Sequence, residues 1–273
     1  MNQISKNLFI TVILLIIILS GCGQKKTEKS TNSIPQSKAD SIKFTPKELV
    51  KSYNNCGPGD LMCTFIKLNY IEATEGKIKE KINKIINDRI INAYEMPDKN
   101  FDNVNLMMET FIRDFETFKK QFPGANQQWI VDYAVSVHGQ TDKVLCLSFF
   151  NSSYLGGAHP MTNIFFSNIN KETGDTLSLV DLFGKGFENK LNSVIDKNFR
   201  EQKELKPGDN LSDKGGLFKN KIIFTDNFAV TSDKGIEFFY NPYDIAPYAM
   251  GTIVVRLSPG DAAGLMTGAS LLK

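Results

Sequence analysis

The chain has 273 residues, and its 32 Lys and Arg nearly balance its 30 Asp and Glu, which leaves a formal net charge of +2. A nucleic-acid partner is therefore not expected, because binding to phosphates needs a concentrated basic surface. The length suits one large domain or two small ones, and the 20 phenylalanines indicate a well-packed globular body.

The N-terminus has the pattern of a bacterial lipoprotein signal peptide. Lys6 precedes an apolar run from Leu8 to Leu19, and small residues then lead to Cys22. A transmembrane anchor is the alternative, but this run is shorter than the roughly 20 apolar residues that span a bilayer. We therefore expect a signal peptide over residues 1–21 and lipidation of Cys22, with palmitate among the acyl groups. The protein would then be a lipoprotein of the cell envelope, periplasmic or surface-exposed, with a membrane anchor.

The next segment, residues 22–43, is polar and rich in Lys, Ser, Thr, Asn and Gln. Such a composition cannot bury enough apolar surface to fold, so we expect a flexible tether. Its lysines could instead contact the membrane surface. The lipid already holds the chain there, which favours the simpler interpretation as a solvated spacer.

Two cysteines, Cys56 and Cys63, enclose the turn-forming segment Gly57–Met62. In an oxidising compartment this spacing predicts a disulfide. A metal site is a weaker interpretation, because no histidine lies nearby, and we expect neither a metal nor a cofactor. Cys146 lies in an apolar stretch and is expected to be a buried, inert thiol.

The first half of the folded region alternates between strand and helix patterns. Residues 64–74 form an expected strand, and isoleucines at helical spacing predict a helix over 77–94. A phenylalanine-rich stripe predicts a second helix over 104–121. Period-two alternation then predicts strands over 129–138 and 143–150, joined by a turn.

The second half repeats this mixture in a different order. We expect a hairpin of 163–169 with 175–179, a helix over 186–204, and short strands over 222–225, 228–231, 236–240 and 252–257. The fold class is therefore α+β, with two small α+β subdomains whose antiparallel sheets are packed by amphipathic helices. The expected ranges are 44–170 for the N-terminal domain, 171–262 for the C-terminal domain and 263–273 for a tail.

Two irregular loops contain the candidate ligand-binding residues. The first, Tyr154–Pro160, contains Gly156, Gly157 and His159, and the second, Asn241–Gly251, contains Tyr243 and Tyr248. Glycines permit unusual backbone shapes, and rigid tyrosines are good contact residues. We expect the two loops to lie near each other, although both could simply pack on their own sheets. His138, at the end of its strand, is expected to be in solvent.

No catalytic residue can be assigned from motifs. The sequence has no zinc-protease spacing, no nucleophile elbow and no phosphate-binding glycine loop. The alternative to a non-enzymatic module is a hydrolase of cell-wall glycan that uses His159 with unidentified carboxylates.

Three motifs together resemble a known family. Tyr154–His159, Asp181-Leu182-Phe183 and Phe238–Gly251 are similar to the extracytoplasmic domain of the lysozyme-binding anti-sigma factor RsiV, whose relatives also occur in envelope lipoproteins and N-terminal to some peptidoglycan deacetylases. The resemblance covers roughly residues 44–260. It implies two small α+β domains that act as a binding or sensing module, with lysozyme or peptidoglycan as candidate ligand, or a lysozyme inhibitor.

Overall fold

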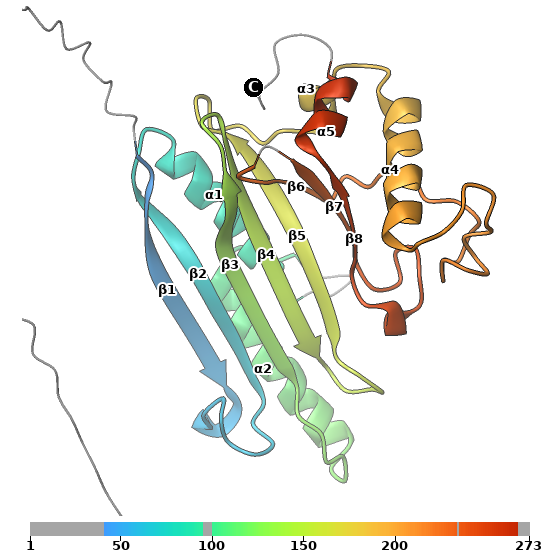
Figure 1. Ribbon diagram of the computed structural model, residues 1–273. Coiled ribbons are helices and arrows are strands. Elements are labelled where there is room, and N and C mark those ends of the chain that lie inside the picture. Colours follow the sequence, from blue (N-terminus) through green and yellow to red (C-terminus); the bar gives the residue numbers. More distant parts are fainter. Residues whose placement is uncertain (1–40, 95–99, 234, 267–273) are drawn as a thin grey trace, which may run out of the picture. The chain divides into compact units, whose positions relative to one another are not determined.

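Two β-sheets organise the part of the chain that the computed structural model describes, which is residues 41–94, 100–233 and 235–266 (Figure 1). These residues lie within a single unit that spans 40–273. The signal peptide, Cys22, nearly all of the expected tether and residues 267–273 lie outside the described residues. The two sheets and five helices confirm the α+β class.

The larger sheet has five strands in the order β1-β2-β3-β4-β5. Its strands are β1 (Lys43–Ser52), β2 (Phe65–Glu75), β3 (Ile130–Gln140), β4 (Val144–Tyr154) and β5 (Met161–Asn170). All neighbours are antiparallel except β2 and β3, which are parallel. This pair corrects the expectation of purely antiparallel sheets. A parallel pair needs a long crossover, and the two helices between β2 and β3 provide it.

Those helices, α1 (Lys79–Ile90) and α2 (Val104–Gln121), cover one face of the larger sheet (Figure 1). The side chain of Asn103 begins α2 by accepting a hydrogen bond from the Leu106 N–H. The apolar stripes of both helices form one buried cluster with strand residues, including Ile82, Ile86, Met107, Phe111, Ile66, Leu68 and Leu147. Burial of these side chains holds the helices on the sheet.

The smaller sheet has the order β6-β7-β8, with all neighbours antiparallel. Its elements are α3 (Leu179–Phe183), α4 (Glu188–Gln202), β6 (Phe228–Val230), β7 (Ile236–Tyr240), β8 (Ile253–Leu257) and α5 (Pro259–Leu265). One face packs against α4 through Leu191, Ile195 and Phe199. Single turns of 3₁₀ helix cover Tyr53–Asn55 and Tyr248–Met250.

The two sheets meet through the other face of the smaller one. Ala229 and Phe239 of the smaller sheet pack against Cys146 and Phe166 of the larger sheet in a small buried cluster. The smaller sheet therefore covers part of the face that α1 and α2 leave open. The expected domain ranges 44–170 and 171–262 stay predictions. No helix within the described ranges is long and apolar enough to cross a membrane.

Several expected elements differ from the structure. Residues 175–179 do not form a strand, since only a single bridge joins Thr176 to Ile169 and the side chain of Ser178 caps α3. Residues 222–225 also lie outside the sheets. The structure adds β1, α3 and α5, which were not expected from the sequence. As an edge strand, β1 carries Pro46 and exposed lysines and so lacks a clear apolar pattern.

Candidate functional site

The two candidate loops lie side by side and bring three aromatic rings together. The ring centroids of His159 and Tyr248 are 3.7 Å apart, with 23° between the ring planes. Tyr243 lies next to both, with its hydroxyl 3.4 Å from Nε2 of His159 and its ring centroid 5.9 Å from that of Tyr248. We call these three residues the aromatic cluster. The expectation that the loops are neighbours is therefore confirmed.

Hydrogen bonds across the two sheets hold these loops together. The Tyr248 hydroxyl donates to the Pro160 carbonyl oxygen at 2.7 Å. The buried amide of Asn241 pairs with the backbone of Ile164 in β5, accepting from its N–H at 2.9 Å and donating to its carbonyl at 3.1 Å. The loop that follows β7 is thereby fixed to the edge of the larger sheet.

The first loop depends on its two glycines. Gly156 and Gly157 have φ angles of 90° and 113°, which side-chain-bearing residues rarely adopt. A Cβ on Gly156 would also come within 2.9 Å of the Gln127 side chain. The Tyr154 hydroxyl donates to the Gly157 carbonyl at 3.1 Å and braces the turn. Both glycines and Tyr154 therefore shape the loop that presents His159.

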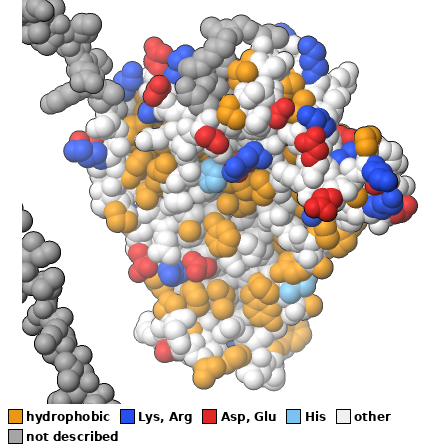
Figure 2. All heavy atoms as spheres, in the orientation of Figure 1, with side chains coloured by type: hydrophobic (Ala, Val, Ile, Leu, Met, Phe, Trp, Pro, Cys, Tyr) orange, Lys and Arg blue, Asp and Glu red, His pale blue; other side chains and the backbone are white. Residues whose placement is uncertain are grey.

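The aromatic cluster is accessible from solvent. His159 is exposed, and Tyr243 is 49% exposed. The described contacts of His159 are two tyrosine rings and the Pro160 carbonyl, 3.0 Å from its Nδ1, with no carboxylate among them. A general base is normally oriented by such a partner, so this arrangement suits contact by stacking and hydrogen bonding better than proton transfer. Figure 2 shows one face of the molecule, on which hydrophobic side chains form patches in the upper, central and lower parts, with charged side chains between and around them.

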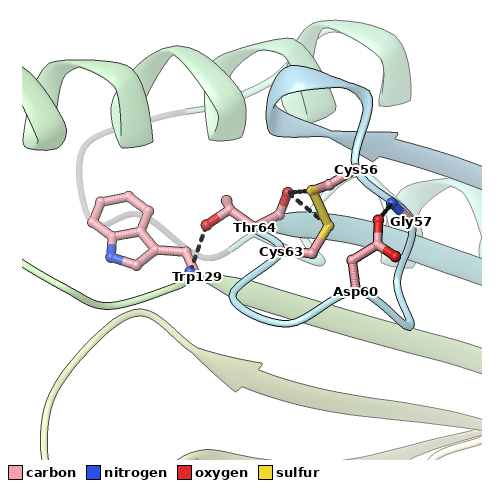
Figure 3. The surroundings of a disulfide bond; sticks show 6 residues. All are labelled: Cys56, Gly57, Asp60, Cys63, Thr64 and Trp129. Carbon is pink, nitrogen blue, oxygen red and sulfur yellow. Dashed lines mark hydrogen bonds between the residues drawn. A yellow bond between two sulfur atoms is a disulfide. The ribbon is translucent and has the colours of Figure 1, made fainter.

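A second exposed feature is the loop between β1 and β2. A disulfide joins Cys56 and Cys63, and the Asp60 carboxylate accepts a hydrogen bond from the Gly57 N–H at 2.7 Å (Figure 3). At the tip, Leu61 is 97% exposed. The loop is attached to the body through Thr64, whose hydroxyl accepts from the backbone N–H of Trp129 (Figure 3).

The sequence analysis missed a polar network at the junction of the sheets. His138 is not fully solvated as expected, because its Nε2 lies 3.2 Å from the Glu237 carboxylate and only 28% of its side chain is exposed. Glu237 also forms an ion pair with Arg256. The sequence signal that could have indicated this contact is the single acidic residue, Glu237, in the otherwise apolar run Ile236–Tyr240.

Cys146 is free and buried beneath the same junction, which confirms the expectation of a buried thiol. Burial, with a smaller contribution from the nearby Glu237 carboxylate, raises the pKa of this thiol to about 12. The thiol therefore stays protonated and unreactive near neutral pH. Among the described residues, no group of three or more His, Cys, Asp or Glu side chains could hold a metal ion.

Two family models match separate parts of the chain. Residues 59–162 match the model described as "Deacetylase PdaC", and residues 180–258 match the one described as "Protein of unknown function (DUF3298)". The first range contains Cys63, the second cysteine of the disulfide, and His159, and the second range contains Tyr243 and Tyr248. No curated protein matches the chain.

Two solved structures resemble the whole described fold. One is a member of the DUF3298 family from Bacteroides fragilis, with a TM-score of 0.71 at 20% identity over 85% of this chain and 96% of that one. The other is a DUF3298 family protein from Pseudomonas aeruginosa PAO1, with a TM-score of 0.64 at 16% identity over 86% and 97% of the two chains. At these identities the likeness supports the shared fold alone.

Proposed function

We propose that this chain is a lipid-anchored module of the bacterial cell envelope that binds a ligand without chemical turnover. The signal-like N-terminus with Cys22 supports the location, and the match to the deacetylase PdaC model agrees with a place near the cell wall. The structural likeness to DUF3298 proteins assigns no activity, so the argument for binding must come from the site itself.

The aromatic cluster is the observation that supports binding. His159, Tyr243 and Tyr248 come from two loops far apart in the sequence, are joined by side-chain hydrogen bonds, and are exposed (His159, Tyr243) or half-buried (Tyr248). Rigid aromatic side chains with a polar end offer contact area at little conformational cost. Tyr154, Gly156 and Gly157 shape the loop beside them. We propose these six residues as the ligand-binding surface.

The candidate ligands are lysozyme and cell-wall glycan, as the resemblance to the RsiV extracytoplasmic domain implies. Both fit exposed rings: sugars can stack on an aromatic face, and proteins use tyrosine at the centre of interfaces. If lysozyme is the ligand, binding could also inhibit it. Within the part of the chain that the structure describes, the contacts of His159 include no carboxylate, so no contact there favours the hydrolase alternative.

The decisive experiment compares binding and turnover on one sample. The purified protein is titrated by calorimetry with hen lysozyme and, separately, with soluble peptidoglycan fragments, and the same sample is tested for muramidase activity. Saturable binding to one ligand, weakened by Tyr248→Ala and without turnover, supports the proposal. Turnover that disappears in His159→Ala would overturn it in favour of an enzyme, and no binding to either ligand would reject both candidates.

A further inference from the structure

The contact between the two sheets is narrow and contains one histidine. His138 lies at a bulge in β3, where the register with β4 shifts between Val137 and Gly139. Its ring sits at the edge of Phe166 of β5, with centroids 4.8 Å apart, and of Phe239 of β7, at 6.0 Å. The imidazole is therefore held between the larger and the smaller sheet rather than free in solvent.

A network of charged side chains adjoins this ring. Glu237 of β7 faces His138 with one carboxylate oxygen and Arg256 of β8 with the other. Asp233, in the turn between β6 and β7, also acts on Arg256 and helps to raise the pKa of that guanidinium, after the larger effect of Glu237. Cys146 from β4 stays an uncharged thiol. Among the residues that the structure describes, this network contains two carboxylates and one guanidinium, so a proton on His138 would add a second positive charge beside Glu237.

We propose that His138, Glu237, Arg256 and Asp233 form a pH-sensitive latch that tightens the contact between the two sheets when the imidazole is protonated. Imidazole is the side chain that ordinarily changes charge between pH 5 and 8. A proton on it adds a positive charge to the donor, so that the contact with the Glu237 carboxylate becomes an ion pair with charge on both partners. This attraction exists only in the folded protein, so the latch gains strength below that pH range and loses it above.

The position of the latch gives it a consequence for the aromatic cluster. His159 belongs to the loop between β4 and β5, whereas Tyr243 and Tyr248 follow β7, so the cluster exists only while the two sheets keep their contact. A junction that is tighter in mildly acidic surroundings would hold both halves of the cluster in place there. The inference about the latch itself does not depend on any ligand.

Thermal unfolding of the full-length chain from pH 5 to 8 tests the latch. The key variant is His138→Gln, whose amide keeps a hydrogen bond to Glu237 but cannot take up a proton, and the control is Val180→Ala, an exposed position of α3 outside this network and outside both loops. We expect the wild-type protein to melt about 2–4 °C above His138→Gln at pH 5.5, with the difference gone at pH 8. The control should follow the wild-type curve. A difference that is the same at both pH values would overturn the proposal.

A direct titration covers the case in which the variant fails to fold. The chain has two histidines, so its imidazole proton resonances are readily assigned by comparison with His159→Gln. We expect the His138 resonance to shift as the pH crosses 5 to 8, together with amide resonances of β6 and β7. A His138 signal that shifts while no amide of the smaller sheet follows would mean that the proton is taken up without tightening the contact, which contradicts the latch.

Discussion

The imidazole of His159 and the ring of Tyr248 lie face to face, with their centroids 3.7 Å apart. The Tyr248 hydroxyl also donates a hydrogen bond to the carbonyl oxygen of Pro160, which lies 88 positions earlier in the chain. His159 lies in the loop between β4 and β5 of the larger sheet, and Tyr248 lies in the loop between β7 and β8 of the smaller one. The contact therefore depends on the packing of the two halves of the fold, and it sets the arrangement of the rings in the aromatic cluster.

The proposed binding surface predicts that affinity and stability can be separated. His159→Ala and Tyr248→Ala should weaken ligand binding roughly five- to thirty-fold, the usual range for an aromatic anchor, with little change in melting temperature. Tyr248→Phe should have a smaller effect, because it keeps the ring and loses only the hydrogen bond to Pro160. Calorimetry and thermal unfolding on each variant measure the two quantities.

Val180→Ala serves as the control for this series, since Val180 is an exposed apolar residue of α3 and belongs to neither loop. If the loops have only a structural role, the ring variants will melt at lower temperature while the affinity of the folded fraction stays that of wild type.

Lipidation of Cys22 is a prediction of its own. Cys22→Ser should abolish incorporation of labelled palmitate and release the protein from membranes, because several acyl chains at about 0.8 kcal/mol for each buried methylene provide the anchor. Metabolic labelling and membrane fractionation are the measurements. Unchanged labelling in the variant would refute the assignment, and Cys146→Ser is the control that should change neither result.

Loss of the disulfide should lower stability without changing the fold. Replacing both Cys56 and Cys63 by serine removes a restraint on the unfolded chain. On the chain-entropy estimate this lowers the free energy of unfolding by about 2.5 kcal/mol. Urea unfolding of the double variant and of the wild-type protein gives the difference. Peptide mass mapping without reductant checks the bond itself, and two free thiols in freshly prepared protein would show that the pairing is wrong.

The close approach of the sheets at Gly139 predicts a specific steric effect. A Cβ on Gly139 would lie 3.1 Å from the Val230 carbonyl oxygen and 3.3 Å from the Ser232 nitrogen, both of them backbone atoms that cannot rotate away. Gly139→Ala should therefore cost about 1–3 kcal/mol of unfolding free energy. Gly124→Ala is the matched control, because nothing lies within 4 Å of its Cβ. Equal urea midpoints for the two variants would contradict this account.

The start of α3 predicts a loss of stability in acid. Hydrogen bonds from the Ser178 hydroxyl and backbone N–H hold the pKa of the Asp181 carboxyl below its usual value. Because the pKa of Asp181 is lower in the folded than in the unfolded protein, its ionised carboxylate stabilises the fold at pH values above the ordinary pKa of Asp. This stabilisation is lost as the pH falls through the folded-state pKa. Asp181→Asn should therefore be less stable than wild type at pH 7, and the difference should vanish well below pH 4. A pH series of urea unfolding measures it.

Local patterns in the sequence determined much of the fold. The phenylalanine stripe of α2 gave its bounds as Val104–Gln121, and period-two alternation located β3 and β4. The Cys56–Cys63 spacing and the buried state of Cys146 also depend on neighbours within a few residues. These features were predictable because local spacing decides which side chains share a face of a helix or strand.

Tertiary contacts decided the rest. The parallel pairing of β2 with β3, the edge strand β1 and the absence of a strand at 222–225 depend on which segments meet in space. For the site, the sequence indicated both loops but not that His159 stacks on Tyr248, and it placed His138 in solvent. Glu237 and Arg256, which lie about a hundred residues further along the chain, surround His138 only after the two sheets pack. Charge networks between distant segments leave no local periodicity, so only the folded structure could reveal this one.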